Sequence, residues 1–307
     1  MIERRNVNYV VDADIRKFFD MVDQQWLMRF LRHRIADERL LRIIIKFLKA
    51  GIMEDGNWQA SEQGTPQGAV ISPILANIYL HYVLDKWFHH QRRSQKIGGE
   101  SYLIRYADDF VVCFQTEEEA ERFLQALRSR LGKFGLSLHP DKTRLIEFGR
   151  DAEEHRRKLG EGKPKTFDFL GFTHYCRKTR GGTFGLGRKP IAKRMVRFLK
   201  RIRVELWRRM HQSVHETGKW LGQVLNGWLN YYAVPWSYWY LRRCFKSLKW
   251  IWLRVLRRRS QKDRTTWEQL QRLTERYWPK LKIRHDWPAR RFSVRHASVT
   301  QGRSRMR

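Results

Sequence analysis

Cysteine is scarce in this 307-residue chain. The three cysteines, Cys113, Cys176 and Cys244, lie far apart and form no paired spacing, which argues against a zinc site or a disulfide framework and fits a reducing compartment. No apolar run approaches the length of a membrane span, and the first residues lack the apolar block of a signal peptide. Acidic residues are also few, 31 against 63 Lys and Arg, so the formal net charge is +32.

The positive charge is concentrated in the second half of the sequence. Residues 1–150 hold 23 basic and 20 acidic residues, whereas residues 151–307 hold 40 and 11, together with ten of the 13 tryptophans. A solvated basic surface or a patch for anionic membranes would also be basic. The charge extends over about 150 residues rather than one amphipathic segment, which favours nucleic acid as the partner.

Two adjacent carboxylates stand out in an apolar setting. The run 101–114 reads SYLIRYADDFVVCF, which predicts a buried β-hairpin with Asp108 and Asp109 at its tip. Carboxylates there cost desolvation free energy unless positive charge meets them. A pair of divalent metal ions would provide that charge and would support phosphoryl transfer.

A second pair of acids lies near the start of the chain. In the run 9–15, apolar residues alternate with Asp12 and Asp14, which predicts a strand with both carboxylates on one face. Asp14 and a hairpin acid could therefore bridge two Mg²⁺ ions, because hard oxygen ligands suit that metal. The pattern alone leaves Asp12 and Asp14 as alternatives.

The segments around these acids predict a mixed α+β layer with helices on one side. Asp23 and Asp37 are expected to cap helices, Ser72 before Pro73 another, and Thr116 with Glu119 a fourth through a capping box. Gly64 and Gly68 bracket a loop whose backbone could approach a ligand closely. Short strands are expected around 135–139 and 144–148, a loop over 149–166, and a hairpin at 167–175.

The remainder of the chain is predicted to be helical and basic. Apolar stripes with basic flanks begin after Pro190, and Thr266 with Gln269 indicates a capped fourth helix. The basic faces are the candidates for nucleic-acid contact, namely Arg194, Arg197, Lys200, Arg201, Arg242 and Arg243. Residues 276–307 are expected to form a docked or mobile basic tail.

Several runs resemble the group II intron reverse transcriptase/maturases of bacteria, in the order expected of that family. They are YADD at 106–109, DADIRKFFD at 12–20, GTPQGAVISPILAN at 64–77, GLSLHPDKT at 135–143, FLGF at 169–172 and LNGWLNYY at 225–232. The resemblance implies an antiparallel palm in 1–178, an α-helical thumb, or maturase domain, in 179–275, and the basic tail in 276–307.

The resemblance also implies roles for particular residues. Asp14, Asp108, Asp109 and Lys142 would be catalytic, and the two Mg²⁺ ions would be held by Asp14, Asp108, Asp109 and the backbone of Ile15. The nucleotide pocket would be formed by Ile15, Phe19, Pro66, Gln67 and Gly68, with Phe19 excluding a ribose 2′-hydroxyl. The primer grip would be formed by Phe169, Leu170, Gly171 and Phe172.

The implied activity is RNA-directed DNA polymerisation with a role in intron splicing. The implied partners are intron RNA, a DNA primer or target and deoxynucleoside triphosphates, without a membrane, in a bacterial cytoplasmic ribonucleoprotein or nucleoid. The fingers region that precedes the first catalytic motif in this family is not found in the sequence. A truncated chain, a separate fingers fragment as partner, and a non-catalytic RNA-binding splicing cofactor therefore stay open as alternatives. A cyclase-like palm enzyme is less favoured because of the long basic thumb.

Overall fold

The computed structural model of this chain describes residues 2–3, 5–50, 52–54, 57–59, 64–65, 70–94, 96–179 and 181–287. The chain divides into two compact units. The first comprises Met1–Leu170 with Tyr175–Leu186, and the second comprises Gly171–His174 with Gly187–Arg307. Each unit has its own apolar core.

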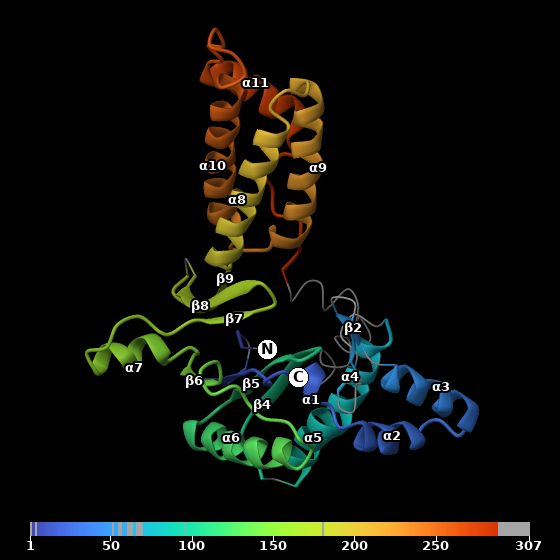
Figure 1. Ribbon diagram of the computed structural model, residues 1–307. Coiled ribbons are helices and arrows are strands. Elements are labelled where there is room, and N and C mark those ends of the chain that lie inside the picture. The colour runs from blue at the N-terminus through green and yellow to red at the C-terminus, as the bar shows by residue number, and fades with distance from the viewer. Residues whose placement is uncertain are drawn as a thin grey trace, which may run out of the picture. The chain divides into compact units, whose positions relative to one another are not determined.

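An antiparallel four-stranded sheet forms the centre of the first unit (Figure 1). Its strands follow the order β4 (Ser101–Tyr106), β5 (Asp109–Phe114), β1 (Tyr9–Ala13) and β6 (Arg144–Glu147). The predicted hairpin and the predicted strand near the N-terminus therefore pair with each other. The inner strand β5 is buried from Phe110 to Phe114, as expected for a continuous apolar run covered on both faces.

The helices of the first unit build its main core. Buried side chains of α2, α3, α4 and α6 join those of β1 and β5 in one apolar cluster, and α6 packs against β1 and β5. The helices are α1 (Phe18–Met21), α2 (Gln24–Arg32), α3 (Glu38–Lys49), α4 (Ser72–Leu80), the π-helix η1 (His81–Asp85), α5 (Lys86–Arg93), α6 (Glu117–Gly132) and α7 (Ala152–Lys158). The predicted α+β class with an antiparallel sheet is confirmed.

The helix caps agree with the sequence in part. Asp23 and Asp37 cap α2 and α3 as predicted, each accepting hydrogen bonds from two backbone N–H groups. The prediction for Ser72 is wrong by one residue, because Ile71 is the N-cap and Ser72 makes no cap hydrogen bond. Thr116 caps α6, but Glu119 is turned away from the cap and accepts from the backbone N–H groups of Gly98 and Gly99, 2.9 and 2.7 Å away.

Further short strands complete the sheet structure. A hairpin of β2 (Ile52–Glu54) and β3 (Asn57–Gln59) precedes α4, and β7 (Phe167–Phe169), β8 (Phe172–Lys178) and β9 (Phe184–Pro190) form a three-stranded sheet. The expected loop over 149–166 contains α7. The expected strand at 135–139 is reduced to one bridge between Ile15 and Leu138.

The second unit contains a helical bundle, with α8, α9 and α10 side by side in Figure 1. Its helices are α8 (Ala192–Arg208), α9 (Val214–Tyr232), α10 (Tyr238–Arg257) and α11 (Trp267–Tyr277). The capping box of Thr266 and Gln269 is confirmed, and Ser213 forms a second one with Glu216. Beyond α11, Trp278 is 7% exposed and stacks on Trp252, so this part of the expected tail is docked. No described helix is long and apolar enough to cross a membrane.

Candidate active site

Asp14 and Lys142 form an ion pair at the end of β1. The ammonium nitrogen Nζ of Lys142 donates to Oδ2 of Asp14 at 2.7 Å. The backbone N–H of His139 donates to the Asp14 carbonyl at 2.8 Å, and the Thr143 N–H closes a turn on the His139 carbonyl at 3.0 Å. This turn projects Lys142 over β1. The hydrogen bond to Asp14 raises the pKa of Lys142, and the charge of Asp109 adds to that effect.

The strand register brings Asp109 next to this ion pair. In the antiparallel pairing of β1 with β5, Asp12 is opposite Val111 and Ala13 is opposite Phe110. One step further along the same register, Asp14 faces Asp109, and opposite residues of an antiparallel pair share one face of the sheet. The structure thus brings together three of the predicted catalytic residues, Asp14, Asp109 and Lys142.

Asp108 lies in the tight turn that connects β4 to β5. Tyr106 pairs with Asp109 across this turn, which leaves Ala107 and Asp108 as its two central residues. Ala107 has φ = 55°. A positive φ at the first central residue favours glycine, so an alanine here stores backbone strain, and such strain is often found at functional sites. The turn presents Asp108 beside the strand that carries Asp109.

Arg105 holds this turn from behind. Its guanidinium donates to both carboxylate oxygens of Asp85, at 2.8 and 2.6 Å, and also to Oδ1 of Asn77 and to the carbonyl of Ala107, each at 2.8 Å. The Arg105 side chain is only 13% exposed. Asn77 belongs to α4 and Asp85 to η1, and a π-helical turn inside a helix often marks a functional site. One arginine therefore ties the aspartate turn to two helical segments.

The predicted site did not include Arg105. A signal was available, because a lone arginine inside an apolar strand needs a buried partner. Its partners Asn77 and Asp85 could not be named from the sequence, since they lie 28 and 20 residues away along the chain.

Asp12 has a structural partner of its own. Nη2 of Arg144 on β6 donates to Asp12 at 2.8 Å, and the Asp12 side chain is 18% exposed. Burial raises the pKa of Asp12, although the Arg144 guanidinium acts in the opposite direction. Asp12 and Asp14 thus point to one face as predicted, but each meets a different cation.

The expected nucleotide pocket is described in part. Ile15 is buried, and Phe19 is half-buried against the main core. Gly64, at φ = 78°, lies so close to Phe19 that an added Cβ would sit 2.6 Å from the Phe19 carbonyl oxygen. The N–H of Thr65 donates to that oxygen at 2.8 Å. The close approach that Gly64 permits is therefore to the chain itself. Pro66, Gln67 and Gly68 lie outside the described residues.

The expected primer grip is a tight hairpin. Leu170 and Gly171, with φ of 48° and 79°, connect β7 to β8, as in a two-residue type I′ turn. In the first unit, Phe169 packs against a small cluster that includes Phe148 and Phe167. In the second unit, Phe172 stacks on Tyr231 at 5.6 Å.

The predicted nucleic-acid contacts all belong to the second unit and are exposed. They are Arg194, Arg197, Lys200 and Arg201 on α8, and Arg242 and Arg243 on α10. Arg242 lies over the Trp239 ring at 5.4 Å and Arg201 over Phe198 at 6.0 Å. No ion pair with a carboxylate occupies any of these six side chains within the described part of the chain.

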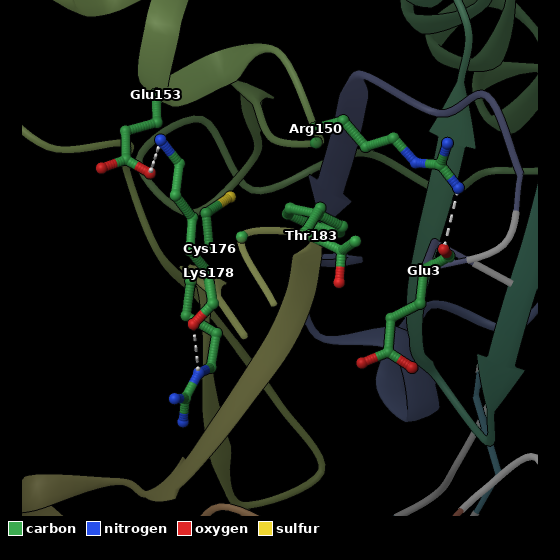
Figure 2. Close-up of a pocket in the computed structure, with 10 residues that line it drawn as sticks. Glu3, Arg150, Glu153, Cys176, Lys178 and Thr183 are labelled. Carbon is green, nitrogen blue, oxygen red and sulfur yellow. Dashed lines mark hydrogen bonds and ion pairs between the residues drawn. The ribbon is translucent and has the colours of Figure 1, made fainter. Parts of the chain in front are cut away.

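A pocket in the first unit lies elsewhere, between α7, β8 and β9 (Figure 2). It has a volume of about 420 Å³. Lys178 pairs with Glu153 at 4.0 Å, and Arg150 donates to the backbone carbonyl of Glu3 at 3.0 Å. The Cys176 thiol in its wall has a pKa raised by burial to about 11, so it is a poor nucleophile at neutral pH. The charges of this pocket largely satisfy one another.

The donor set of the candidate active site suits Mg²⁺. Carboxylate oxygens are its preferred ligands, and Mg²⁺ in phosphoryl-transfer sites is held by one or two carboxylates together with substrate phosphates. Asp14 already attracts a cation, the Lys142 ammonium. Within the described ranges, no three His, Cys, Asp or Glu side chains gather into a ready-made metal cage. The pair Asp14 and Asp109 is therefore the part of the site that fits the metal.

Similar proteins point in one direction. The chain is 34% identical over 163 residues to protein YkfC of Escherichia coli, covering 45% of this chain and 43% of that protein. It is 43% identical over 79 residues to the group II intron-encoded protein LtrA of Lactococcus lactis, covering 26% of this chain and 13% of LtrA. The chain thus spans less than half the length of these curated relatives.

A solved structure supports the fold. Telomerase from Candida albicans, solved in complex with a fragment of telomeric RNA, superposes with a TM-score of 0.50 at 12% identity. The match covers 87% of this chain and 42% of the telomerase chain. At this identity the likeness concerns the fold alone.

A family model described as reverse transcriptase (RNA-dependent DNA polymerase) matches residues 1–174. This region contains the sheet, the aspartate turn, Asp14 and Lys142. Because the match covers more than half of the sequence, the chain belongs to the reverse transcriptase family.

Proposed function

We propose that this chain is an RNA-directed DNA polymerase that also serves as the maturase of a group II intron. The observation that carries the proposal is the meeting of Asp14, Asp109 and Lys142 on one face of the antiparallel sheet, beside the Asp108 turn. The family match and the intron-encoded relative LtrA support the same reading.

In this proposal, Asp14, Asp108 and Asp109 hold two Mg²⁺ ions together with the triphosphate of the incoming nucleotide. When bound, the metal neutralises the phosphate charge and lowers the pKa of the primer 3′-hydroxyl. Lys142 keeps its proton near neutral pH, because Asp14 raises its pKa. Its ammonium is thus able to leave Asp14 and to donate a proton to the departing pyrophosphate.

Other residues of the first unit would position the substrates. Phe19 would limit the space beside the sugar, and the loop that begins at Gly64 would cover the nucleotide. Arg105 fixes the turn that carries Asp108, so the carboxylates need little rearrangement when substrates arrive. In the second unit, the exposed cations of α8 and α10 would contact the phosphates of intron RNA and of the template–primer duplex.

Primer extension on an RNA template with Mg²⁺ tests this proposal. The chain should extend a DNA primer with deoxynucleotides, and Asp108→Ala should abolish the extension. Extension that persists in Asp108→Ala would contradict the assigned site. If neither protein extends the primer while both bind intron RNA, the polymerase part of the proposal fails and only an RNA-binding role remains.

A further inference from the structure

A groove between α10 and α11 of the second unit has no role in the polymerase site described above. It has a volume of about 550 Å³ and runs along α10 from Tyr238 to Lys249, with α11 and Trp278–Leu281 as its other wall. Eleven helical residues span roughly 16 Å. The groove is therefore long enough for a short stretch of an extended polymer.

The groove is strongly basic. Arg242, Lys246, Lys249 and Lys280 line it, against a single acid, Glu275, which accepts a hydrogen bond from Gln271 at 3.2 Å. In the part of the chain that the structure describes, no carboxylate forms an ion pair with any of the four cations. Four unneutralised cations along one groove are complementary to a chain of phosphates.

Aromatic rings line the same groove. Tyr238 and Trp267 are 38% and 37% exposed, whereas Phe245 and Trp278 are buried at 8% and 7% and lie 5.7 Å apart. Trp267 is supported by Trp250 at 5.0 Å, which limits its side-chain freedom. Large rings left partly exposed beside cations form a surface on which nucleobases can stack.

The combination of charge and aromatic rings discriminates between kinds of nucleic acid. A duplex presents its phosphates, but its bases are already stacked on one another and cannot reach the rings. An unpaired strand offers both groups at once. We infer that the α10–α11 groove binds unpaired nucleotides of the RNA, with Tyr238 and Trp267 stacking on bases and the four cations contacting phosphates. This inference rests on the RNA-binding part of the proposed function and adds a site specific for single strands.

Fluorescence anisotropy with two labelled probes, an unstructured RNA and an RNA duplex of equal length, tests the inference. The full chain is compared with the double variant Tyr238→Leu/Trp267→Leu, which keeps apolar bulk and removes the rings. The double variant should bind the unpaired RNA at least about five-fold more weakly for each ring removed. Its affinity for the duplex should not change.

Two further variants keep the test decisive. Trp207→Leu makes the same change at a tryptophan of similar exposure, 38%, that does not line the groove, and it should bind both probes as the unaltered chain does. Lys246→Gln/Lys249→Gln leaves the rings in place. It should lower the slope of log affinity against log salt for the unpaired RNA by roughly 0.7 for each phosphate that is no longer neutralised. This second variant serves if the ring substitutions disturb folding.

Undiminished binding of the unpaired RNA by both groove variants would overturn the inference, as would an equal loss on both probes. A loss confined to the same oligonucleotide made as DNA would overturn the assignment to RNA. These outcomes are separable from the proposed function: a chain that extends primers but is indifferent to groove substitutions refutes only the groove. A chain that binds neither probe refutes the RNA-binding role as well.

Discussion

At the scale of single residues, Asp12 and Asp14 show how two acids on one strand face acquire different roles. Asp12 is paired with Arg144 from the neighbouring strand β6, so its charge is matched inside the sheet. Asp14 lies just beyond β1 and meets Lys142, which projects from a turn and is 62% exposed. A lysine held this way can move aside for a substrate or an ion, whereas Arg144 is fixed by its strand.

The substitution Asp12→Asn should respond to pH in a defined direction. Burial raises the pKa of Asp12 in the folded state, so the ionised form is disfavoured by folding. The stability linked to this group is present below its ordinary pKa near 3.8 and is lost as the pH rises through the raised value. Relative to the unaltered chain, Asp12→Asn should thus be more stable at pH 7 than at pH 3.5. Chemical denaturation at both pH values checks this, and an Asn variant that loses relative stability on going to pH 7 would contradict it.

Arg105→Lys should weaken the clamp behind the aspartate turn. A lysine cannot reproduce the paired hydrogen bonds to Asp85 while also reaching Ala107. We expect a loss of about 1–3 kcal/mol in the free energy of unfolding. The polymerisation rate should fall while the Michaelis constant for nucleotide changes little, because the carboxylates lose their fixed position.

Arg5→Lys is the matched control for this prediction. The Arg5–Glu100 pair is 3.4 Å long with side chains 42% and 35% exposed, so its loss should change stability by less than about 1 kcal/mol. Equal effects of the two substitutions on stability and rate would argue against a special role for Arg105.

The sequence carried enough information for the main acids but not for their neighbours. Asp108 and Asp109 could be identified because adjacent carboxylates in an apolar hairpin have little structural use. The choice between Asp12 and Asp14 came from the family resemblance, since strand alternation treats them alike. The ion pair of Lys142 and the contacts of Arg105 depend on segments distant in the sequence, and no local pattern encodes them.

At the scale of elements, the packing of α9 against the end of α11 depends on two glycines. A Cβ at Gly222 would lie 2.3 Å from the Tyr277 carbonyl oxygen, and one at Gly218 would lie 2.5 Å from the Tyr277 ring. These small residues let the two chain segments approach closely. The close approach therefore requires glycine despite its poor helix propensity.

Gly222→Ala should destabilise the second unit. Overpacking costs roughly 1–3 kcal/mol, and the gain in helix propensity of up to about 1 kcal/mol offsets only part of it. Gly227→Ala in the same helix has nothing within 4 Å of the new methyl group and should be stabilising by about 0.5–1 kcal/mol. Thermal unfolding of the two variants measures both effects, and a shift of the same sign for both would contradict this packing.

Element prediction succeeded where a local rule operates and failed where distant contacts decide. Asp23, Asp37 and Thr266 cap helices by hydrogen bonds within their own turn, so their patterns are sufficient. Glu119 could serve either its cap or a neighbouring loop, and the contact with Gly98 and Gly99 prevails. The helix α7 was missed because only Ala152 in it is buried, which leaves no apolar periodicity.

At the scale of the whole molecule, the chain has two separate apolar cores, and each contains a buried cysteine. Cys113 is 0% exposed in the first unit and Cys244 is 1% exposed in the second. Burial raises the pKa of both thiols to about 12, so neither is appreciably ionised at pH 8 in the folded state.

Thiol labelling at pH 8 should therefore follow the unfolding of each unit. Cys113 and Cys244 should resist alkylation in the native chain and become reactive at different denaturant concentrations, because each reports on its own core. Mass spectrometry of tryptic peptides resolves the two sites. Labelling of both thiols in native conditions, or in one shared transition, would contradict independent cores.

The division of labour between the two units follows from amino-acid composition alone. Near-neutral charge with paired acids marks the sheet unit, and high positive charge with many tryptophans marks the helical one. Which tryptophans remain exposed beside cations could not be predicted, because helical periodicity assigns most of them to a core. Tyr238 and Trp267 are distinguished only by the arrangement of α10 and α11.

The rate of primer extension by Asp14→Asn, measured beside Asp12→Asn, tests the central claim most directly. Both changes remove one carboxylate charge from the same face of the sheet, two residues apart. Asp14→Asn should abolish extension on an RNA template with Mg²⁺, while Asp12→Asn should fold and extend the primer at a rate close to that of the unaltered chain. Robust extension by Asp14→Asn, or loss of extension in a folded Asp12→Asn alone, would contradict the assignment of Asp14 to the active site.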